Sequence, residues 1–506
     1  MKGTLMVQGT ASSVGKSLLC AAFCRILKQD GFSPVPFKSQ NMALNSFVTR
    51  EGLEMGRAQV MQAEAAGIEP RVEMNPILLK PTSDQGSQVI VMGRTVGNMA
   101  AMEYLEWKEK LLPVIDEAFE ILSRNHDIVV IEGAGSPAEI NLREKDLVNM
   151  GLACRLKAPV LLAGDIDRGG VFASLYGTVA LLQPNERELL KGVIINKFRG
   201  DRKVLEPGLR QLEELIKIPV LGVVPFMHLN LDDEDSITER FTVSPEKRDL
   251  KAQVILLPHI SNFTDFNPLE LFDDLSLTYI RKPAELDSPD LLILPGSKNT
   301  IEDLSYLRSA GWEEPLKDYV GKGSLLMGIC GGFQMLGKKI LDPYQVESSL
   351  PEVPGFGFLD IETIMEKEKS TRQVEAFWRY RDGDYFACMG EEEPLSGYEI
   401  HMGRTNYRSV RHPVYVQTTE QWEGAVGQKG RVFGTYLHGI FDNIIWTEKL
   451  LNALRRRRGL PEKSSALPQA YREYKEKEYD TLAAVVRENL DMDQIYKIIK
   501  QGVKGR

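Results

Sequence analysis

The sequence predicts an α/β protein with two doubly wound, mostly parallel α/β domains and a helical C-terminal appendage. The main observation is that short apolar runs alternate with helical patterns twice along the chain. Strands that are separated by helices need crossover connections, which are typical of parallel sheets. In addition, 506 residues provide enough chain for two or three domains of roughly 150 residues each.

The first domain is predicted at residues 1–232. It opens with a buried strand at 4–7, followed by a helix whose apolar face starts at Leu19 and which ends at Gly31. Further apolar runs predict strands at 127–132, 159–163, 192–196 and 220–224.

A polar, charged run at 233–251 is predicted to be a linker. The second domain is predicted at 252–445, with apolar strands at 253–257, 291–296, 324–330 and 431–437. Residues 446–506 look helical and highly charged, and they also carry an apolar stripe formed by Leu482, Val485, Val486 and Leu490. This last part is therefore predicted to dock as an appendage.

The composition excludes several classes of protein. Apolar residues make up 43% of the chain and charged residues 26%, as in soluble globular proteins. The 71 acidic residues exceed the 62 Lys and Arg, and this net charge of −9 disfavours nucleic-acid binding. No signal peptide and no run of roughly 18 apolar residues is present. With five sparse cysteines, the sequence predicts a cytoplasmic protein that binds no membrane, and leaves a homo-oligomer open.

A phosphate-binding loop is predicted at 9–17, where the sequence GTASSVGKS joins the first strand to the first helix. Lys16 is expected to reach the β- and γ-phosphates, and the Ser17 hydroxyl to bind Mg²⁺. The spacing departs from the usual one, because five residues separate Gly9 from Gly15 and Thr10 occupies the expected glycine position. The alternative is an ordinary Gly/Ser-rich turn before a helix.

The altered spacing resembles the loop of the dethiobiotin synthetase family, which uses ATP to activate a carboxylate. The resemblance implies that ATP is bound by Gly9, Thr10, Ser13, Gly15, Lys16 and Ser17. It also implies that Glu132, at the end of a strand, shares Mg²⁺ with Ser17, and that Asn196 contacts adenine. Without the resemblance, Glu132 is a candidate Mg²⁺ ligand and Asn196 a strand-end cap.

A nucleophile elbow is predicted at 328–334, where the sequence GICGGFQ follows an apolar strand and opens a helix. The glycines permit a tight turn that exposes Cys330 above the sheet. A buried structural cysteine is the alternative, but it needs no flanking glycines. The cysteine requires a base, and His438 ends a strand of the same predicted sheet.

Together with LPGS at 294–297 and YLHG at 436–439, this elbow resembles the class I glutamine amidotransferase domain. The resemblance implies that Cys330 attacks the side-chain amide of glutamine while His438 shuttles the proton. It implies that N–H groups of Gly331, Gly296 and Ser297 hold the oxyanion. Most members place an acid two residues after the histidine, where this chain has Ile440. Glu399, Asp442 or no acid at all are left open as the partner of His438.

Four further segments resemble the cobyric acid synthase family: PFKSQNMALNS at 36–46, EMGRAQ at 54–59 through NPILLKP at 75–81, DIDRGG at 165–170 and GYEIHMGR at 397–404. The resemblance implies amidation of the b, d, e and g carboxylates of adenosylcobyrinic acid a,c-diamide, with ATP, Mg²⁺ and glutamine, in cobalamin biosynthesis. It implies an acyl phosphate that captures ammonia from the glutaminase. The candidate corrinoid-binding residues are Lys38, Gln40, Asn41, Arg57, Lys80 and Arg168. Solvated surface or helix ends are the alternative for each.

Three other functions compete with this one, and one of them is a plain glutaminase whose N-terminal domain only regulates it. A cobyrinic acid a,c-diamide synthase would share both domain types, but the segment at 36–46 argues against it. An ATPase switch carrying an amidotransferase-like binding module would be expected to lack Cys330 or His438, and both are present.

Overall fold

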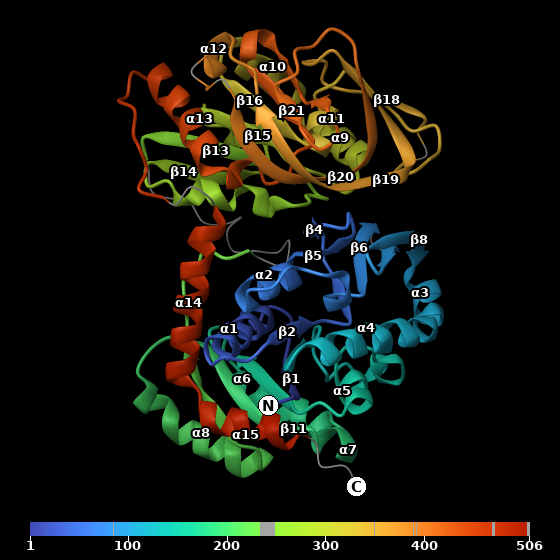
Figure 1. Ribbon diagram of the computed structural model, residues 1–506, viewed down its shortest axis with the longest axis vertical. Coiled ribbons are helices and arrows are strands. Elements are labelled where there is room, and N and C mark those ends of the chain that lie inside the picture. The colour runs from blue at the N-terminus through green and yellow to red at the C-terminus, as the bar shows by residue number, and fades with distance from the viewer. Residues whose placement is uncertain are drawn as a thin grey trace. The chain divides into compact units, whose positions relative to one another are not determined.

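The computed structural model describes residues 1–83, 86–232, 248–348, 350–387, 389–390, 392–467 and 471–502. The chain forms two compact units, shown in Figure 1. Unit 1 consists of Met1–Ala43, Met55–Glu234 and Lys475–Arg506, and unit 2 of Leu44–Glu54 and Asp235–Tyr474. Most of the predicted linker, 233–247, lies outside the described residues. The domain boundaries proposed from the sequence stay a prediction.

Unit 1 is built on a six-stranded sheet in the order β12-β11-β10-β1-β9-β2. All neighbouring strands in it are parallel, so their carboxyl ends share one edge. The strands are β1 (Gly3–Gly9), β2 (Pro34–Phe37), β9 (Ile128–Glu132), β10 (Val160–Asp165), β11 (Leu190–Phe198) and β12 (Val220–Pro225). The predicted α/β class is confirmed for this unit. Near-continuous apolar runs are typical of strands that are covered on both faces of a parallel sheet.

Helices and a small second sheet complete the N-terminal part of unit 1 (Figure 1). The longer helices are α1 (Lys16–Gln29), α2 (Arg57–Ala66), α4 (Leu112–Asn125), α6 (Val171–Leu181) and α8 (Arg202–Ile216). Shorter ones are α3 (Ala101–Trp107), α5 (Met150–Leu156) and α7 (Pro184–Arg187). The second sheet has the order β3-β6-β7-β8, with β3 (Gln40–Met42), β6 (Ile77–Ser83), β7 (Gly86–Val91) and β8 (Arg94–Ala100).

The C-terminal helices α14 (Tyr471–Asn489) and α15 (Met492–Gln501), red in Figure 1, belong to the core of unit 1 from Lys475 onward. Arg25 of α1 pairs with Glu476 of α14 at 2.7 Å. The backbone N–H of Asp491 donates to the Leu221 carbonyl of β12 at 2.8 Å. Their buried apolar side chains join the cluster that covers β1, namely Tyr479, Leu482, Ala483, Val486, Leu490, Ile495, Ile498 and Ile499. Leu482, Val486 and Leu490 of the predicted apolar stripe therefore belong to the core of the first unit, whereas Val485 is half-buried.

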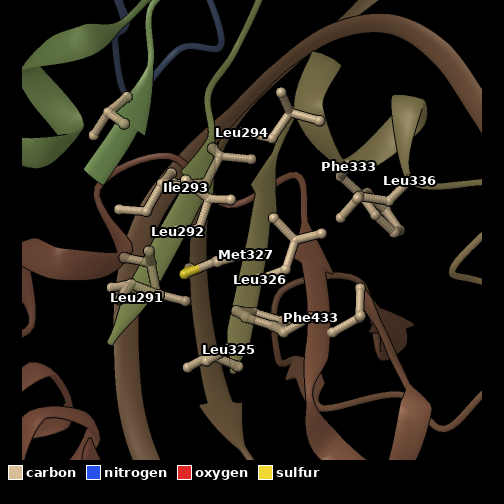
Figure 2. Packing of buried hydrophobic residues seen from close by; sticks show 14 of the residues in the cluster. Leu291, Leu292, Ile293, Leu294, Leu325, Leu326, Met327, Phe333, Leu336 and Phe433 are labelled. Carbon is tan, nitrogen blue, oxygen red and sulfur yellow. The ribbon is translucent and has the colours of Figure 1, made fainter. Parts of the chain in front are cut away.

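Unit 2 contains a second six-stranded sheet in the order β14-β13-β15-β16-β24-β23. Its strands are β13 (Leu250–Ile255), β14 (Leu275–Ile280), β15 (Leu291–Leu294), β16 (Leu325–Ile329), β23 (Ala425–Gly427) and β24 (Val432–Thr435). Neighbours are parallel except β23, which runs antiparallel to β24. Figure 2 shows leucines of β15 and β16 packed with Phe333, Leu336 and Phe433. The predicted α/β class is thus confirmed here too.

A mainly antiparallel sheet accompanies the parallel sheet of unit 2, in the order β18-β17-β19-β21-β22 with β20 paired to β19. Its strands are β17 (Lys339–Leu341), β18 (Glu352–Pro354), β19 (Ile361–Trp378), β20 (Glu393–Tyr407), β21 (Val414–Val416) and β22 (Gln421–Glu423). The remaining strands are β4 (Ser46–Val48) in unit 2 and β5 (Glu54–Gly56) where the chain returns to unit 1.

The helices of unit 2 join and cover these strands. They are α9 (Thr300–Ser309), α10 (Glu313–Gly321), α11 (Gly331–Met335), α12 (Gly383–Phe386) and α13 (Ile444–Arg457). Two 3₁₀ helices matter for the site, η5 (Phe263–Leu271) and η8 (Ile440–Asp442). Within the described part of the chain, no helix is both long and apolar enough to cross a bilayer.

Candidate active sites

The loop between β1 and α1 folds around the Lys16 side chain in unit 1. The Lys16 ammonium donates to the carbonyl oxygens of Ala11 at 2.9 Å and Gly135 at 3.1 Å. Ser13 and Gly15 adopt left-handed backbone conformations, with φ of 57° and 93°. The loop therefore wraps a buried cation at the carboxyl edge of the sheet, which is where a phosphate loop binds its anion.

Asn196 contacts this loop from the end of β11. Its side-chain amide donates to the Val14 carbonyl at 2.8 Å. A Cβ at Gly15 would lie only 2.4 Å from the Asn196 nitrogen, so this close approach requires glycine. At the start of the loop, the Thr10 N–H donates to the Ala163 carbonyl of β10 at 2.9 Å. Asn196 thus fixes the loop, and its contact with adenine stays a prediction.

Glu132, at the end of β9, is fully buried and is the centre of a polar cluster beside the loop. One carboxylate oxygen accepts from the Ser17 hydroxyl at 2.8 Å and from the Lys38 ammonium at 2.9 Å. The other accepts from the side-chain amides of Gln62 at 2.5 Å and Gln59 at 3.4 Å. Neither glutamine was predicted as a site residue from the sequence, although their i, i+3 spacing on α2 places them on one helix face.

The Ser17 and Glu132 side chains fit the predicted Mg²⁺ site. Hydroxyl and carboxylate oxygens are the donors that Mg²⁺ prefers, and the ion usually takes only one or two carboxylates, with phosphates and waters filling its other positions. Among the described residues, no group of three or more His, Cys, Asp and Glu side chains could hold a metal. The Lys38 ammonium bonds the same Glu132 oxygen as Ser17, so an incoming cation would displace it.

The structure brings some of the predicted corrinoid-binding residues to this cluster. Lys38 contacts Glu132 directly, and the Asn41 amide donates to Gln59 at 3.2 Å. Gln40 accepts a hydrogen bond of 2.6 Å from the Tyr104 hydroxyl. These three residues of one short segment therefore lie on or next to the carboxyl edge of the sheet.

The other predicted corrinoid-binding residues have different surroundings. Arg57 forms a buried ion pair with Asp232 at 3.0 Å. Lys80 is buried within β6. Arg168 is exposed and lies 4.0 Å from the carboxylate of Asp165. Their roles toward a substrate stay predictions.

An open cavity of about 290 Å³ lies beside the phosphate loop. Thr10, Ala11 and Ser12 form one part of its lining, and Lys108 and Arg143 are among the residues of the other part. The sequence analysis did not single out Lys108 or Arg143, because both lie in charged segments that carry no motif.

In unit 2, Cys330 lies at the sharp turn between β16 and α11. Its backbone has φ of 51° and ψ of −108°, a conformation rare for a residue with a side chain. The Cys330 N–H donates to the Thr435 carbonyl at 2.8 Å, and a Cβ at Gly332 would lie only 1.9 Å from the Leu294 carbonyl oxygen. This strained, glycine-dependent geometry is that of a nucleophile elbow.

His438 follows β24 and is buried against the same site. Its Nδ1 donates to Asp265 at 2.7 Å, and the Gly439 N–H donates to the other Asp265 oxygen at 3.1 Å. Its buried Nε2 has no hydrogen-bond partner among the described residues. Burial lowers the pKa of His438, but the hydrogen-bonded carboxylate of Asp265 and the neighbouring Cys330 outweigh that effect and raise the pKa to about 10. A thiol, an imidazole and a carboxylate are thus brought together, a set of groups that can serve as nucleophile, base and acid.

We expect the Asp265–His438 pair to make stability depend on pH. The folded-state pKa of His438, about 10, lies above the ordinary value of 6.5, so the contribution is complete below pH 6.5 and is lost as pH rises to about 10. Urea unfolding of the wild type and of Asp265→Asn should therefore differ most near pH 6 and least near pH 10. A difference in the free energy of unfolding that stays constant over this range would contradict the assignment.

Asp265 was not among the predicted partners of His438. It lies on η5, 173 residues before His438, and no spacing connects the two. Glu399, one of the two candidates, pairs instead with Arg372 at 2.7 Å and lies 3.6 Å from His401. The only local signal was a polar stretch, SNFTDFN at 261–267, directly after an apolar strand.

The predicted oxyanion residues lie together around this site. A Cβ at Gly331 would be 2.9 Å from the Ser297 nitrogen, and one at Gly296 would be 3.5 Å from Cε1 of His438. The turn after β15 and the start of α11 therefore face each other next to the histidine. This arrangement can present backbone N–H groups to an anion that forms at the thiol.

Comparisons with known proteins match both parts of the chain to families. Residues 5–235 match the model of the CobQ/CobB/MinD/ParA nucleotide binding domain, and residues 251–446 match that of the CobB/CobQ-like glutamine amidotransferase domain. The cobyric acid synthase of Caldanaerobacter subterraneus subsp. tengcongensis is 51% identical over 98% of this chain and 98% of its own. Those of Clostridium botulinum (strain Loch Maree / Type A3) and Streptococcus sanguinis (strain SK36) are 54% and 50% identical, over 98% and 100% of this chain and 99% and 100% of their own.

Proposed function

The chain belongs to the cobyric acid synthase family. From this premise we propose that it amidates the b, d, e and g carboxylates of adenosylcobyrinic acid a,c-diamide with ATP and glutamine. The observation that supports this proposal is that one chain carries both a phosphate loop around Lys16 and a Cys330–His438–Asp265 arrangement. The first site suits activation of a carboxylate, and the second suits release of ammonia from an amide.

Cys330 acts as the nucleophile of the glutaminase. The thiol proton is held by Nε2 of His438, whose raised pKa keeps the imidazole protonated at neutral pH, and the sulfur forms a bond to the side-chain carbonyl carbon of glutamine. The oxyanion is held by N–H groups of Gly331 and Ser297. His438 returns the proton to the leaving nitrogen, and ammonia departs. Water, deprotonated by His438, then cleaves the thioester to glutamate, while Asp265 keeps Nδ1 protonated and Nε2 directed at the sulfur.

Lys16 and the loop N–H groups serve the synthetase reaction. A substrate carboxylate oxygen bonds to the γ-phosphorus of ATP, the bond to ADP breaks, and an acyl phosphate forms. Ammonia then bonds to the acyl carbon, phosphate leaves, and one proton is released. Lys16 stabilises the charge that builds up on the transferred phosphoryl group. Ser17 and Glu132 would hold Mg²⁺, which supplies additional positive charge at the phosphates when bound.

Both activities on one chain serve a chemical purpose. Ammonia is mostly protonated at neutral pH, and water competes for the acyl phosphate. Release of ammonia by the same protein that forms the acyl phosphate raises its effective concentration, and well-oriented reactants gain up to roughly 7–11 kcal/mol in this way. Localisation in the cytoplasm and assembly into a homo-oligomer stay predictions.

Mass spectrometry tests the proposal directly. Adenosylcobyrinic acid a,c-diamide is incubated with the enzyme, ATP, Mg²⁺ and glutamine labelled with ¹⁵N in the amide. We expect successive labelled amides, up to four for each corrinoid. If ATP or glutamine is consumed while the corrinoid stays unchanged, the two proposed reactions stand, but the substrate is a different carboxylate.

A further inference from the structure

The cavity beside the phosphate loop carries side chains for which the proposed function has no role. Its volume is about 290 Å³, and all of its lining residues belong to unit 1. Ala11 and Gly135, whose carbonyl oxygens hold the Lys16 ammonium, are both part of the lining. The cavity therefore opens next to the place where the phosphoryl group is transferred in the proposed reaction.

This cavity lies on the opposite side of β1 from Asn196. In the sheet order β12-β11-β10-β1-β9-β2, Asn196 lies near the end of β11, whereas Ala134 and Gly135 of the lining follow β9. Ligands of such sheets bind outside the carboxyl ends of the strands. A nucleotide whose base lies near Asn196 leaves the β9 side for the second reactant. The cavity is thus placed to take part of the substrate.

Two lysines of like charge act on each other at this cavity. Lys108, on the 3₁₀ helix η2 (Lys108–Leu111), is part of the lining, and its ammonium donates to the Lys145 carbonyl at 3.4 Å. The Lys145 ammonium donates in turn to the Leu105 carbonyl at 3.3 Å. Burial lowers the pKa of Lys108 and the charge of Lys145 lowers it further, while Asp146 offsets only part of this. An anion bound at Lys108 would relieve the repulsion between the two ammonium groups.

Arg143 brings a second group of donors to the same cavity. It lies on the 3₁₀ helix η3 (Ile140–Lys145), and its guanidinium donates to the Leu181 carbonyl at 2.6 Å. Its Nε lies 3.9 Å from the carboxylate of Glu186, which is too far for a hydrogen bond. A guanidinium has five N–H donors in one plane, which suits two parallel hydrogen bonds to a carboxylate or a phosphate. Arg143 and Lys108 both line a further cavity of about 250 Å³ as well, so open space borders both side chains.

The acidic residues of the lining mainly bind backbone N–H groups. Asp146 accepts three such hydrogen bonds of 2.9 Å at the turn before α5, and Glu186 accepts one of 2.8 Å from Gln183. Glu139 is exposed to solvent. Lys108 and Arg143 therefore have donors left for a ligand, and an anionic group is the chemistry that fits between them and the phosphate loop.

We propose that Lys108 and Arg143 bind a carboxylate of the substrate other than the carboxylate that is being activated. This inference rests on the proposed function, whose substrate carries several carboxylates. Such an anchor holds the substrate beside the phosphate loop, and it favours acids with several carboxylates over acids with one. A nucleotide phosphate is the other anion that these two cations could bind, and the experiment below distinguishes the two.

Variants of the full chain test this proposal. Lys108→Met and Arg143→Met each remove one charge, and Lys108→Arg keeps it. Lys110→Met is the matched control, because Lys110 is an exposed residue of the same 3₁₀ helix as Lys108. Isothermal titration calorimetry gives the Kd of adenosylcobyrinic acid a,c-diamide without ATP. Amidation with ammonium gives kcat and the KM values for the corrinoid and for ATP without any contribution from glutamine hydrolysis.

In Lys108→Met and Arg143→Met, we expect the Kd and the KM for the corrinoid to rise by about 10-fold or more, because each variant loses a charge-assisted hydrogen bond to the carboxylate. The KM for ATP and the kcat at saturating corrinoid should stay within about 3-fold of wild type, since the anchor binds a group that does not react. Lys108→Arg should stay within about 3-fold of wild type in the corrinoid Kd, and Lys110→Met should match wild type.

Three results would overturn the inference while the proposed function stands. The first is a corrinoid Kd and KM of wild-type size in both Met variants. The second is a raised KM for ATP with an unchanged Kd for the corrinoid, which would assign the two cations to the nucleotide phosphates. The third is a loss of kcat alone, which would show a merely structural role. A wild type that neither binds nor amidates the corrinoid would instead contradict the proposed function, and the anchor with it.

The two Met variants change separate elements, η2 and η3, so each tests the anchor by itself. Circular dichroism shows whether each variant is folded. If Lys108→Met or Arg143→Met failed to fold, Lys108→Gln or Arg143→Gln would take its place, because glutamine removes the charge but keeps a polar end. The same rise in the corrinoid Kd is expected, and an unchanged Kd in the folded variants would contradict the anchor.

Discussion

Cys330→Ala should lower glutamine-dependent amidation by about 10³-fold or more, while amidation with high ammonium continues at the wild-type rate. In the proposed mechanism the thiol forms the covalent bond to glutamine, and removal of a catalytic nucleophile typically costs several orders of magnitude in kcat. The synthetase reaction needs only free ammonia, which ammonium salts supply. Corrinoid amides are counted by mass spectrometry with glutamine and with ammonium as nitrogen source.

Cys154→Ala is a matched control, because Cys154 is also a free cysteine but lies in unit 1. It should keep both activities. If Cys330→Ala lost both activities while remaining folded, the thiol would have to serve the synthetase reaction as well, contrary to the assignment of separate sites.

Lys16→Ala should have the opposite effect, lowering amidation from either nitrogen source by about 10²- to 10³-fold, as is typical for loss of one donor to a developing negative charge. The Lys16 ammonium is buried in the loop and is held by two carbonyl oxygens. Glutamate formation in the absence of ATP should remain within about 2-fold of wild type.

Lys28→Ala provides the comparison for Lys16→Ala, since Lys28 lies on the exposed side of the same helix. Phosphate release from ATP and corrinoid amidation are both measured. Undiminished amidation in Lys16→Ala would show that the loop at 9–17 does not bind the triphosphate in the assigned way.

The fold class could be predicted because buried parallel strands leave a local trace in the sequence. Runs such as Ile128–Glu132 and Leu291–Leu294 are short, apolar and followed by glycine-containing turns. Each can be predicted as a strand without knowing which strands lie beside it. Lys16 and Cys330 were found for a related reason. Each occupies a strand-to-helix turn whose glycines are required by the backbone itself.

Asp265, Gln59 and Gln62 could not be found in this way. The position of each is set by which elements the fold places side by side, and no local pattern records that choice. Asp265 reaches His438 because η5 and the turn after β24 meet at the carboxyl edge of the sheet. The apolar stripe that includes Leu482 likewise showed that α14 is buried on one side, but not which core it completes.

The return of the C-terminal helices has a consequence for synthesis of the protein on the ribosome. Domains generally fold in the order in which they are made, from the N-terminus onward. Unit 1 departs from this order, because Arg25 can bond to Glu476 only after that residue, 451 positions later in the chain, has been translated. Until the last residues emerge, the apolar face of β1 and α1 lacks its cover from α14 and α15. That apolar face must therefore be kept from aggregating during almost the whole of translation. A chain that is truncated before α14 would leave the core of its nucleotide-binding unit uncovered.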